Sequence, residues 1–432
     1  MLARGTRSAA VGWRRFATRP YRAYQVLTLG QGGVVALAGD AITVPALLAI
    51  GASPAIVTAI AAITALGGVG QIFLPRLLHR THGKLRLVTL VATAVGESRG
   101  LVLGVLFALS AAGVPLGVVL PLVAITLACA GLFSSVGLAN QMTWFRVILP
   151  ESERRFVAPR VSGMAMGIAA ILLLPMALLV DVTGGGPAVY AGILFVGGLA
   201  GLLELAAVGR LRHPGKVTVT GQAQSGPIVQ PTGWRRFVES MFLSGVAGGL
   251  TPYFSVFAIS VLHFSSGFAI LMSALGSGIA LITATAVGAI LAQGSSSRLL
   301  RLSMVLRAIS VFVVLAAFPG NPLAAALLLS AVVLSSSGNA IGQISATERV
   351  FRLTEGGATI ALSSQFVAVS SGSVGGAQIV AAGVITVGLA GYPVFALLLG
   401  LSGVIRLAAV RLIPVSESWT SQTGIFIVPS AK

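Results

Sequence analysis

Four charged side chains lie inside long apolar stretches of the sequence, where a charge is costly and marks a candidate functional site. They are Asp40, Glu97, Arg99 and Glu204. A carboxylate shielded from water can take up and release a proton, so Asp40 and Glu97, with Arg99 as a counter-charge, are candidates for proton coupling. The competing hypothesis is a static ion pair that fixes helix packing, and the sequence leaves both open.

The spacing of these charges limits how they pair. Glu97 and Arg99 are two residues apart, and residues two apart on a helix point to different sides. Arg99 therefore needs a partner from another helix, and Asp40 is the expected one because both lie at or beyond the middle of their stretches. Glu204 lies nearer the end of its stretch, and we expect it to make a structural or gating contact.

Uncharged polar side chains in the same stretches mark a candidate substrate cavity. Tyr253 follows Pro252, and a proline at such a place frees a backbone carbonyl and bends the helix. Asn140 and Asn339 occupy similar places in the two parts of the chain. Hydrogen bonding between helices is the alternative for most of these side chains. The cavity candidates are Gln31, Asn140, Asn339, Gln343, Tyr253 and Gln365.

The sequence carries no signature of an enzyme or of a metalloprotein. It has no P-loop, and its four histidines lack metal-ligand spacing. The single cysteine, Cys129, permits no disulfide within the chain. We therefore expect no catalytic residues, no metal site and no cofactor, and an intramembrane enzyme is the hypothesis with least support.

These residues must be positioned by helices that use lipid as their solvent. Of the 432 residues, 56% are hydrophobic and only 9% are charged, and the mean hydropathy is +0.98. A soluble domain has about 25% charged residues, and a helix needs about 20 apolar residues to cross a membrane. The sequence predicts an all-α membrane protein with twelve transmembrane helices. They are expected near 24–49, 55–78, 86–110, 115–140, 159–182, 187–209, 238–262, 267–292, 299–318, 322–345, 358–387 and 392–413.

The formal net charge of +18 is distributed asymmetrically over this map. Lys and Arg precede the first predicted helix and flank every second connection, whereas the other connections carry none. The positive-inside rule then places both termini in the cytoplasm of a multi-pass protein in the cell inner (plasma) membrane. The surplus charge is explained by topology and by attraction to anionic lipid, so nucleic-acid binding is not expected. Arg307 and Arg406 lie a few residues inside their stretches and are expected to extend toward the interface.

A repeated tetrapeptide divides the chain into two halves. Trp-Arg-Arg-Phe occurs at 13–16 and again at 234–237, each time shortly before a predicted helix. The Arg-rich start has the composition of a mitochondrial presequence, but the repeat favours its being part of the fold. We expect an N-terminal six-helix half at 1–209, a cytoplasmic linker at 210–237, a C-terminal six-helix half at 238–413 and a cytoplasmic tail at 414–432. Two parallel halves are a known transporter design.

The chain resembles the major facilitator superfamily over nearly its whole length. The family has a basic loop between spans two and three, Asp-Arg-x-Gly-Arg-Lys after a glycine, and this chain has His-Arg-Thr-His-Gly-Lys-Leu-Arg at 79–86. The Asp is absent and one residue is added before the Gly. The resemblance implies a two-half transporter fold and a gating role around this loop. The gating candidates are Arg80, Gly83, Lys84, Arg86 and, from the sixth helix, Glu204.

Two functional hypotheses follow from these features. The first is a secondary transporter that moves a small, lipophilic or amphipathic organic solute, coupled to protons, by alternating access. The second is a non-transporting membrane protein on the same scaffold, such as an assembly factor or receptor, because the loop pattern is altered. Under either hypothesis the partners are lipid and a small molecule, with protons under the first, and the chain is expected to be a monomer.

Overall fold

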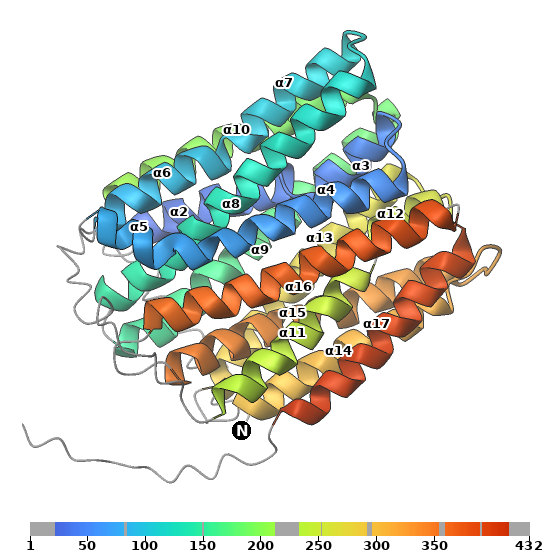
Figure 1. The fold of residues 1–432 in the computed structure, drawn as a ribbon. Helices are drawn as coiled ribbons and strands as arrows, with labels where there is room; N and C mark the ends of the chain where they lie inside the picture. Colours follow the sequence, from blue (N-terminus) through green and yellow to red (C-terminus); the bar gives the residue numbers. More distant parts are fainter. Residues whose placement is uncertain are drawn as a thin grey trace, which may run out of the picture.

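The computed structural model describes residues 22–81, 84–148, 151–211, 233–251, 253–291, 296–353, 359–388 and 391–413. These residues are helical, with short turns between the helices (Figure 1). Gly83, Pro252 and the first copy of the repeated tetrapeptide lie outside them. The greater part of the predicted linker and the whole predicted tail do so as well.

The helices reproduce the twelve predicted spans. Eleven helical segments of the described residues are long and apolar enough to cross a membrane. The twelfth is α14, which carries Arg298, Arg301 and Arg307 and is correspondingly less apolar. The segments are α2 (Arg22–Leu37) with α3 (Asp40–Ala49); α4 (Pro54–Gly67) with the 3₁₀ helix η2 (Gly68–Phe73) and α5 (Leu74–Arg80); α6 (Leu85–Glu97) with α7 (Arg99–Ala111); α8 (Leu116–Ile148); α9 (Glu151–Thr183); α10 (Pro187–Arg210); α11 (Trp234–Leu250) with α12 (Phe254–Ser260); α13 (Ser266–Leu291); α14 (Ser296–Leu315); α15 (Ala324–Leu353); α16 (Thr359–Val387); and α17 (Tyr392–Leu412).

Four of the predicted spans are divided into shorter elements. The second passes through the 3₁₀ helix η2 between α4 and α5. The first breaks at Gly39, whose backbone is extended, with ψ at −176°. The third pauses at Ser98, which stays in a helical conformation, and its N–H still donates to the Ala94 carbonyl over 3.2 Å. The seventh breaks at Thr251, which is extended because it precedes a proline. The first and seventh spans occupy corresponding places in the two halves, so the fold has matched broken helices.

Glycine and proline mark the connections between helices at one end of the bundle. Gly51 and Gly113 adopt φ values of +93° and +92°, which favour glycine. The Ser53 hydroxyl accepts a hydrogen bond from the Ile56 N–H, and Pro54 opens α4. These turns belong to the connections without Lys or Arg, and we call that end of the bundle the outer end. The opposite end is the inner end.

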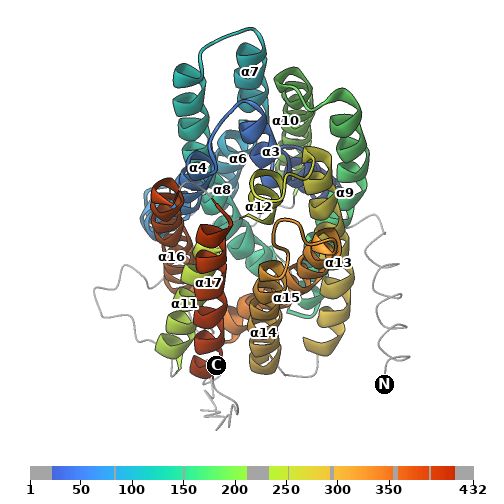
Figure 2. The same cartoon turned by 90° about the vertical axis from the view of Figure 1, so that its right-hand side faces the viewer.

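The helices pack as two groups that meet along a seam. In Figure 1 the helices of the first group, coloured blue to green, lie on one side, and those of the second group, coloured yellow-green to red, lie on the other. The seam is formed mainly by α9 against α13 and α4 against α16, and at the outer end by α3 against α12 and α13. Figure 2 views the same arrangement after a quarter turn. The exact boundaries of the two halves stay a prediction.

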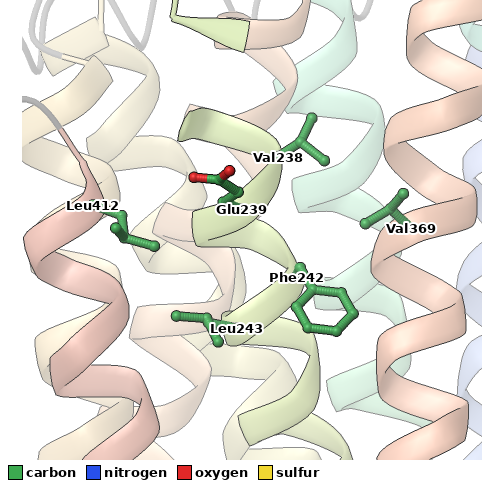
Figure 3. A pocket seen from close by; sticks show the side chains of 6 residues that line it. All are labelled: Val238, Glu239, Phe242, Leu243, Val369 and Leu412. Carbon is green, nitrogen blue, oxygen red and sulfur yellow. The ribbon is translucent and has the colours of Figure 1, made fainter. Parts of the chain in front are cut away.

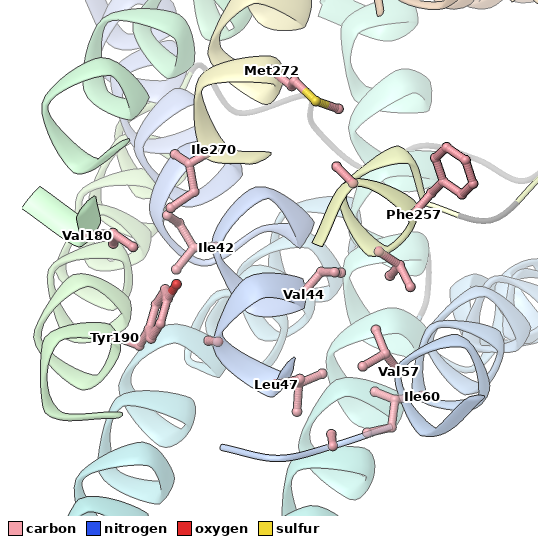
Figure 4. Close-up of a cluster of buried hydrophobic side chains, with 14 of the residues drawn as sticks. Ile42, Val44, Leu47, Val57, Ile60, Val180, Tyr190, Phe257, Ile270 and Met272 are labelled. Atoms are coloured by element: carbon pink, nitrogen blue, oxygen red, sulfur yellow. The ribbon is translucent and has the colours of Figure 1, made fainter. Parts of the chain in front are cut away.

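The buried core differs between the two ends of the bundle. Toward the outer end, one continuous cluster joins side chains of both groups, including Ile42, Tyr190, Phe257 and Ile270 (Figure 4). Toward the inner end, the larger clusters each belong to one group. One is built from α2, α9 and α10, and another is centred on Trp234 and Phe237 of α11. The two groups are therefore joined by a common core at the outer end.

The outward-facing surface is apolar, as a lipid-embedded bundle requires. Ile171, Val182 and Val387 are 70%, 85% and 87% exposed, and all three lie in helices long enough to cross a membrane. Because lipid tails are as apolar as these side chains, burial does not drive the helices together, and close packing takes its place. Small residues at the helix contacts are what such packing needs.

Labelling of single cysteines tests which end of the bundle faces outward. In a Cys129→Ala background, a cysteine replacing the exposed Ala112 at the outer end should react with a membrane-impermeant maleimide in intact cells. A cysteine replacing the exposed Lys84 should react only after permeabilisation. The opposite pattern would invert the topology.

Candidate functional site

Three of the intramembrane charges come together in the first half, with Gln31 beside them. Glu97 ends α6, Arg99 begins α7, Glu204 lies in α10 and Gln31 lies in α2. The Glu204 carboxylate interacts with Gln31, Glu97 and Arg99. The sequence separated Glu204 from this group as a gating residue, whereas the fold places it in the same cluster.

Close helix contacts bring these side chains together. A side chain at Gly201 of α10 would begin 2.8 Å from the Glu97 Cβ, and one at Gly30 of α2 would begin 2.6 Å from the Glu204 Cβ. Both positions therefore exclude a side chain, and the backbones of α2, α6 and α10 approach each other closely. Glu204 follows Gly201 by three residues, so it lies on the same face of α10 and points toward the same neighbours.

The electrostatics of this cluster are unbalanced. Glu204 is 6% exposed, and the Glu97 Oε2 and Arg99 Nε atoms are buried without a hydrogen-bond partner. Ser134 of α8 lies beside the Glu97 carboxylate. Two carboxylates around one guanidinium give a net charge of −1 when both are ionised, and a single bound proton makes the cluster neutral. Such a group can hold and release one proton.

Asp40 makes a different contact from the one that the sequence predicts. Its carboxylate accepts a hydrogen bond from the Tyr253 hydroxyl over 3.1 Å, so it joins α3 of the first group to the start of α12 in the second. A pair with Arg99 is not among the ion pairs of the described residues, and that expectation was wrong. The break at Gly39 explains the difference, because it starts a new helix at Asp40 and redirects the side chain.

A second contact of this kind involves a residue that the sequence analysis missed. The Asp181 carboxylate, near the end of α9, accepts a hydrogen bond from the Gly267 N–H over 3.1 Å. Gly267 lies in the first turn of α13, where free N–H groups and the helix dipole favour a negative charge. An acidic residue at the outer end of a predicted span was the available signal. Asp181–Gly267 and Asp40–Tyr253 together bridge the two groups at the outer end.

The cavity candidates occupy several environments. Asn339 and Gln343 of α15 and Gln365 of α16 are exposed, whereas Gln31 is half-buried in the carboxylate cluster. The side chain of Asn140 lies outside the described residues. Asn339 and Gln343 lie inside their span, where an exposed amide is costly against lipid, so their positions favour a water-lined surface, whereas Gln365 lies at the start of its span.

The gating candidates lie at the inner end. Arg80 and Lys84 are exposed, and Gly83 lies outside the described residues. The Arg86 guanidinium donates to the backbone carbonyl of Gly209 at the end of α10. This bond ties the first turn of α6 to the last turn of α10, where free carbonyls and the helix dipole favour a cation.

Two arginines of the second half lie deeper than the sequence predicts. Arg406 is 4% exposed, and its Nη1 and Nη2 donate to the Arg307 carbonyl over 2.8 Å and to the Thr251 hydroxyl over 2.9 Å. Arg307 is half-buried and donates from Nη1 to the Ser244 hydroxyl over 3.3 Å. The expectation that Arg307 and Arg406 extend toward the interface was therefore wrong. Ser244 of α11, Thr251 at its end and the Arg307 carbonyl of α14 hold them inside the bundle.

A shallow groove of about 430 Å³ lies near the inner end of the second group (Figure 3). It is nearly entirely apolar, and its one charged residue, Glu239, already pairs with Arg235 over 2.8 Å. None of the predicted site residues contributes to it, so the groove is separate from the charge clusters. The lining residues are Val238, Glu239, Phe242, Leu243, Val369 and Leu412.

The comparisons with known proteins concern the fold. No protein-family model matches the sequence, and no curated protein matches it at a significant level. Solved structures do match. A mutant of the nucleoside transporter NupG aligns with 91% of this chain and 99% of its own, at a TM-score of 0.63 and 14% identity. The xylose transporter XylE from E. coli aligns with 91% of this chain and 97% of its own, at a TM-score of 0.66 and 14% identity. A mutant of the E. coli fucose:proton symporter FucP aligns with 91% of this chain and 98% of its own, at a TM-score of 0.58 and 14% identity.

The chain has the major facilitator fold. It is a multi-pass, all-α membrane protein, and the solved structures that it resembles are transporters rather than enzymes. Identities of 14% carry the fold and leave substrate and coupling to be argued from the residues of this chain.

Substitution of Gly201 tests the packing of the carboxylate cluster. Gly201→Val places atoms within 2.8 Å of both the Glu97 Cβ and its carbonyl oxygen. We expect a loss of about 1–3 kcal/mol of stability, measured as a lower melting temperature of the purified protein. Gly192→Val is the matched control on the same helix, because nothing lies within 4 Å of its added Cβ. Equal effects of the two changes would contradict the close contact.

Proposed function

We propose that the protein is a secondary transporter of a small organic solute, coupled to protons and working by alternating access. The observation that carries this proposal is the cluster of Glu97, Arg99 and Glu204. Intramembrane ionisable groups of this kind mark ion pathways and proton relays. The fold supports the same function, since the structures that it resembles include a fucose:proton symporter.

The cluster supplies a simple coupling step. With one proton bound, the two carboxylates and Arg99 are together neutral, and the cluster can cross between outward-facing and inward-facing states at low electrostatic cost. Without the proton, a net negative charge remains in the interior and opposes the change. Gln31 and Ser134 provide uncharged polar neighbours for both protonation states.

The arrangement of the seam supports alternating access. The outer end is closed by a shared apolar core and by two hydrogen bonds between the groups, whereas the larger inner clusters belong to one group each. The matched breaks in the first and seventh spans meet at this outer closure, and discontinuous helices at corresponding places are the best pointer to a transport site. The proposed transporter therefore opens by separating α3 from α12 and α13.

The remaining features fit a small amphipathic solute. The exposed amides of Asn339, Gln343 and Gln365 provide a few polar contacts in an otherwise apolar bundle. We place the protein in the cell inner (plasma) membrane as a monomer with cytoplasmic termini. The alternative, a non-transporting membrane protein, is favoured by the missing Asp in the loop at 79–86 and predicts no flux of any solute.

Proton movement in liposomes tests the coupling. A panel of sugars, nucleosides, carboxylic acids and amphipathic amines is applied to proteoliposomes that contain a pH-sensitive dye. At least one solute should drive acidification, and Glu97→Gln or Glu204→Gln should lower its rate by about tenfold or more, because neither side chain can then bind and release a proton.

The matched control is Glu239→Gln, which removes a carboxylate that is 44% exposed and engaged with Arg235. It should leave the rate unchanged. Solute flux that persists without proton movement would sink the coupling, and the absence of any flux across the panel would favour the non-transporting alternative.

Removing the outer hydrogen bonds tests the closure. In the double variant Tyr253→Phe with Asp181→Asn, one bond between the groups is lost and the other is weakened. A hydrogen bond contributes about 0.5–1.5 kcal/mol, so the outward-open population should rise about 2- to 30-fold. Spin labels on cysteines at positions 112 and 323, one in each group, should report a larger share of long distances.

Tyr392→Phe is the matched control for this measurement. It removes a tyrosine hydroxyl that donates to the Leu315 carbonyl over 2.6 Å within the second group. If it changes the distance distribution as much as the double variant does, the bonds across the seam have no special role in closure.

A further inference from the structure

Two arginines in the second half form a positively charged site inside the membrane-spanning bundle. Arg307 of α14 and Arg406 of α17 both reach toward α11, which lies against α16 and α17. Arg406 binds the Arg307 carbonyl and the Thr251 hydroxyl, and its Nε is buried without a hydrogen-bond partner. The Thr251 hydroxyl is in turn 2.6 Å from the Ser402 hydroxyl, so Arg406 is held from several sides.

No carboxylate of the described residues neutralises this pair. Between residues 233 and 413, the described acidic residues are Glu239 and Glu348. Glu239 pairs with Arg235, away from the arginines. Glu348 follows Gly338, the point at which α15 contacts Arg307, by ten residues, which is about 15 Å along a helix. The two guanidinium groups therefore lie in the interior as neighbouring like charges.

Such an arrangement is unfavourable unless an anion completes it. Burying a charge without a counter-charge costs several kcal/mol, and a second cation nearby adds repulsion. Hydroxyl and carbonyl partners satisfy donors but supply no negative charge. The guanidinium fork matches the two oxygens of a carboxylate or phosphate, which makes arginine the side chain suited to bind such groups.

The position of Arg307 gives it access to a ligand. Its stem passes over Gly338 of α15, where an added Cβ would lie 2.6 Å from the Arg307 Cγ, and its Nη2 lies near Gly248 of α11. The side chain thus runs from a peripheral helix between α15 and α11, and it remains partly exposed. The break of α11 at Thr251 lies beside it and offers free backbone groups.

We propose that Arg307 binds the acidic group of the transported solute, a carboxylate or phosphate, and that Arg406 is a positioning residue behind it. The proposal rests on the proposed transport function and narrows its substrate to amphipathic organic anions. One solute anion at Arg307 and one proton at the cluster of Glu97 and Glu204 carry no net charge together. The bound proton makes the cluster in the first half neutral, and a monovalent anion lowers the charge of the arginine pair in the second half from +2 to +1. Loading both together leaves the net charge inside the membrane unchanged, whereas loading one site alone changes it by one unit.

Ligand binding to the purified protein in detergent tests this site without requiring transport. The probes are octanoate, octyl phosphate and the uncharged octanamide, which share one apolar chain, with phosphatidylglycerol as the lipid arm. At least one acid should raise the melting temperature and octanamide should not. Arg307→Gln should weaken acid binding about 10- to 100-fold, and Arg307→Lys, which keeps the charge but loses the fork, by less.

Arg298→Gln is the control, because it removes an exposed arginine from the same helix. Binding that is unchanged in Arg307→Gln and Arg307→Lys overturns the proposal, and so does stabilisation by phosphatidylglycerol alone, which would make the site a lipid contact. If Arg307→Gln does not fold, the proposal is tested by comparing acid binding in Arg307→Lys with acid binding in the unaltered protein.

Arg406→Lys separates positioning from direct binding. As a positioning residue, it should weaken octanoate binding less than Arg307→Lys does while preserving the preference for acid over amide. An equal or greater loss would reverse the two roles. Proton-coupled flux of uncharged solutes with no acid binding would leave the transport proposal intact and refute the anion site. Acid binding that depends on Arg307, without any flux in liposomes, would support the anion site and refute the transport proposal.

Discussion

A polar group inside a lipid-embedded bundle must find its partner within the protein, and this constraint shapes the whole molecule. Helices satisfy the backbone, and the described residues accordingly form helices joined by short turns. Side chains obey the same constraint. Thr28, Thr58 and Thr126, for example, each donate to the carbonyl four residues earlier in their own helix. Glu97, Arg99 and Arg406 are charged residues that depart from this pattern, because each keeps a buried side-chain atom without a hydrogen-bond partner.

Those charges are divided between the halves according to sign. The first half holds two carboxylates around Arg99, and the second half holds Arg307 and Arg406 with hydroxyl and carbonyl partners. Each group packs against a glycine whose missing side chain leaves room for a charged one. Glu97 packs against Gly201, and Arg307 packs against Gly338. The proposed proton would complete the group in one half and the proposed anion would complete the group in the other, and the two ligands are opposite in charge.

Much of this fold follows from sequence, and the parts that do not have identifiable causes. Apolar length and the one-sided arginines predicted all twelve spans, because crossing a membrane fixes a helix length that few sequences meet by chance. The break at Gly39 was missed, since hydropathy does not register a local change in backbone direction, whereas Pro252 indicated the bend in the seventh span. Glu204 was misplaced for a related reason. The sequence shows that Glu204 lies near the end of its helix, which indicated a gating contact. It does not show that α10 contacts α6 at Gly201, which places Glu204 beside Glu97. The depth of Arg406 could not be predicted either, because its hydrogen bond to Thr251 and the contact of Thr251 with Ser402 of α17 depend on tertiary packing.

The seam is closed at the outer end, and opening it would separate apolar faces of the two groups. In water, separating the apolar faces of α3, α12 and α13 would cost about 25 cal/mol for each Å² exposed, and the shared outer cluster is extensive. The larger inner clusters each contain side chains of one group only, so in this conformation the apolar contact between the groups is most extensive at the outer end. A ligand changes the balance only through its different affinity for the two states. An anion at Arg307 lies beside the break of α11, and α12 beyond that break forms the closure with α3. Binding there can therefore act on the closure through a single short helix. The proposed proton site would act on the same closure from the first half, because Gln31 lies in α2, eight residues before the break at Gly39 that leads into α3.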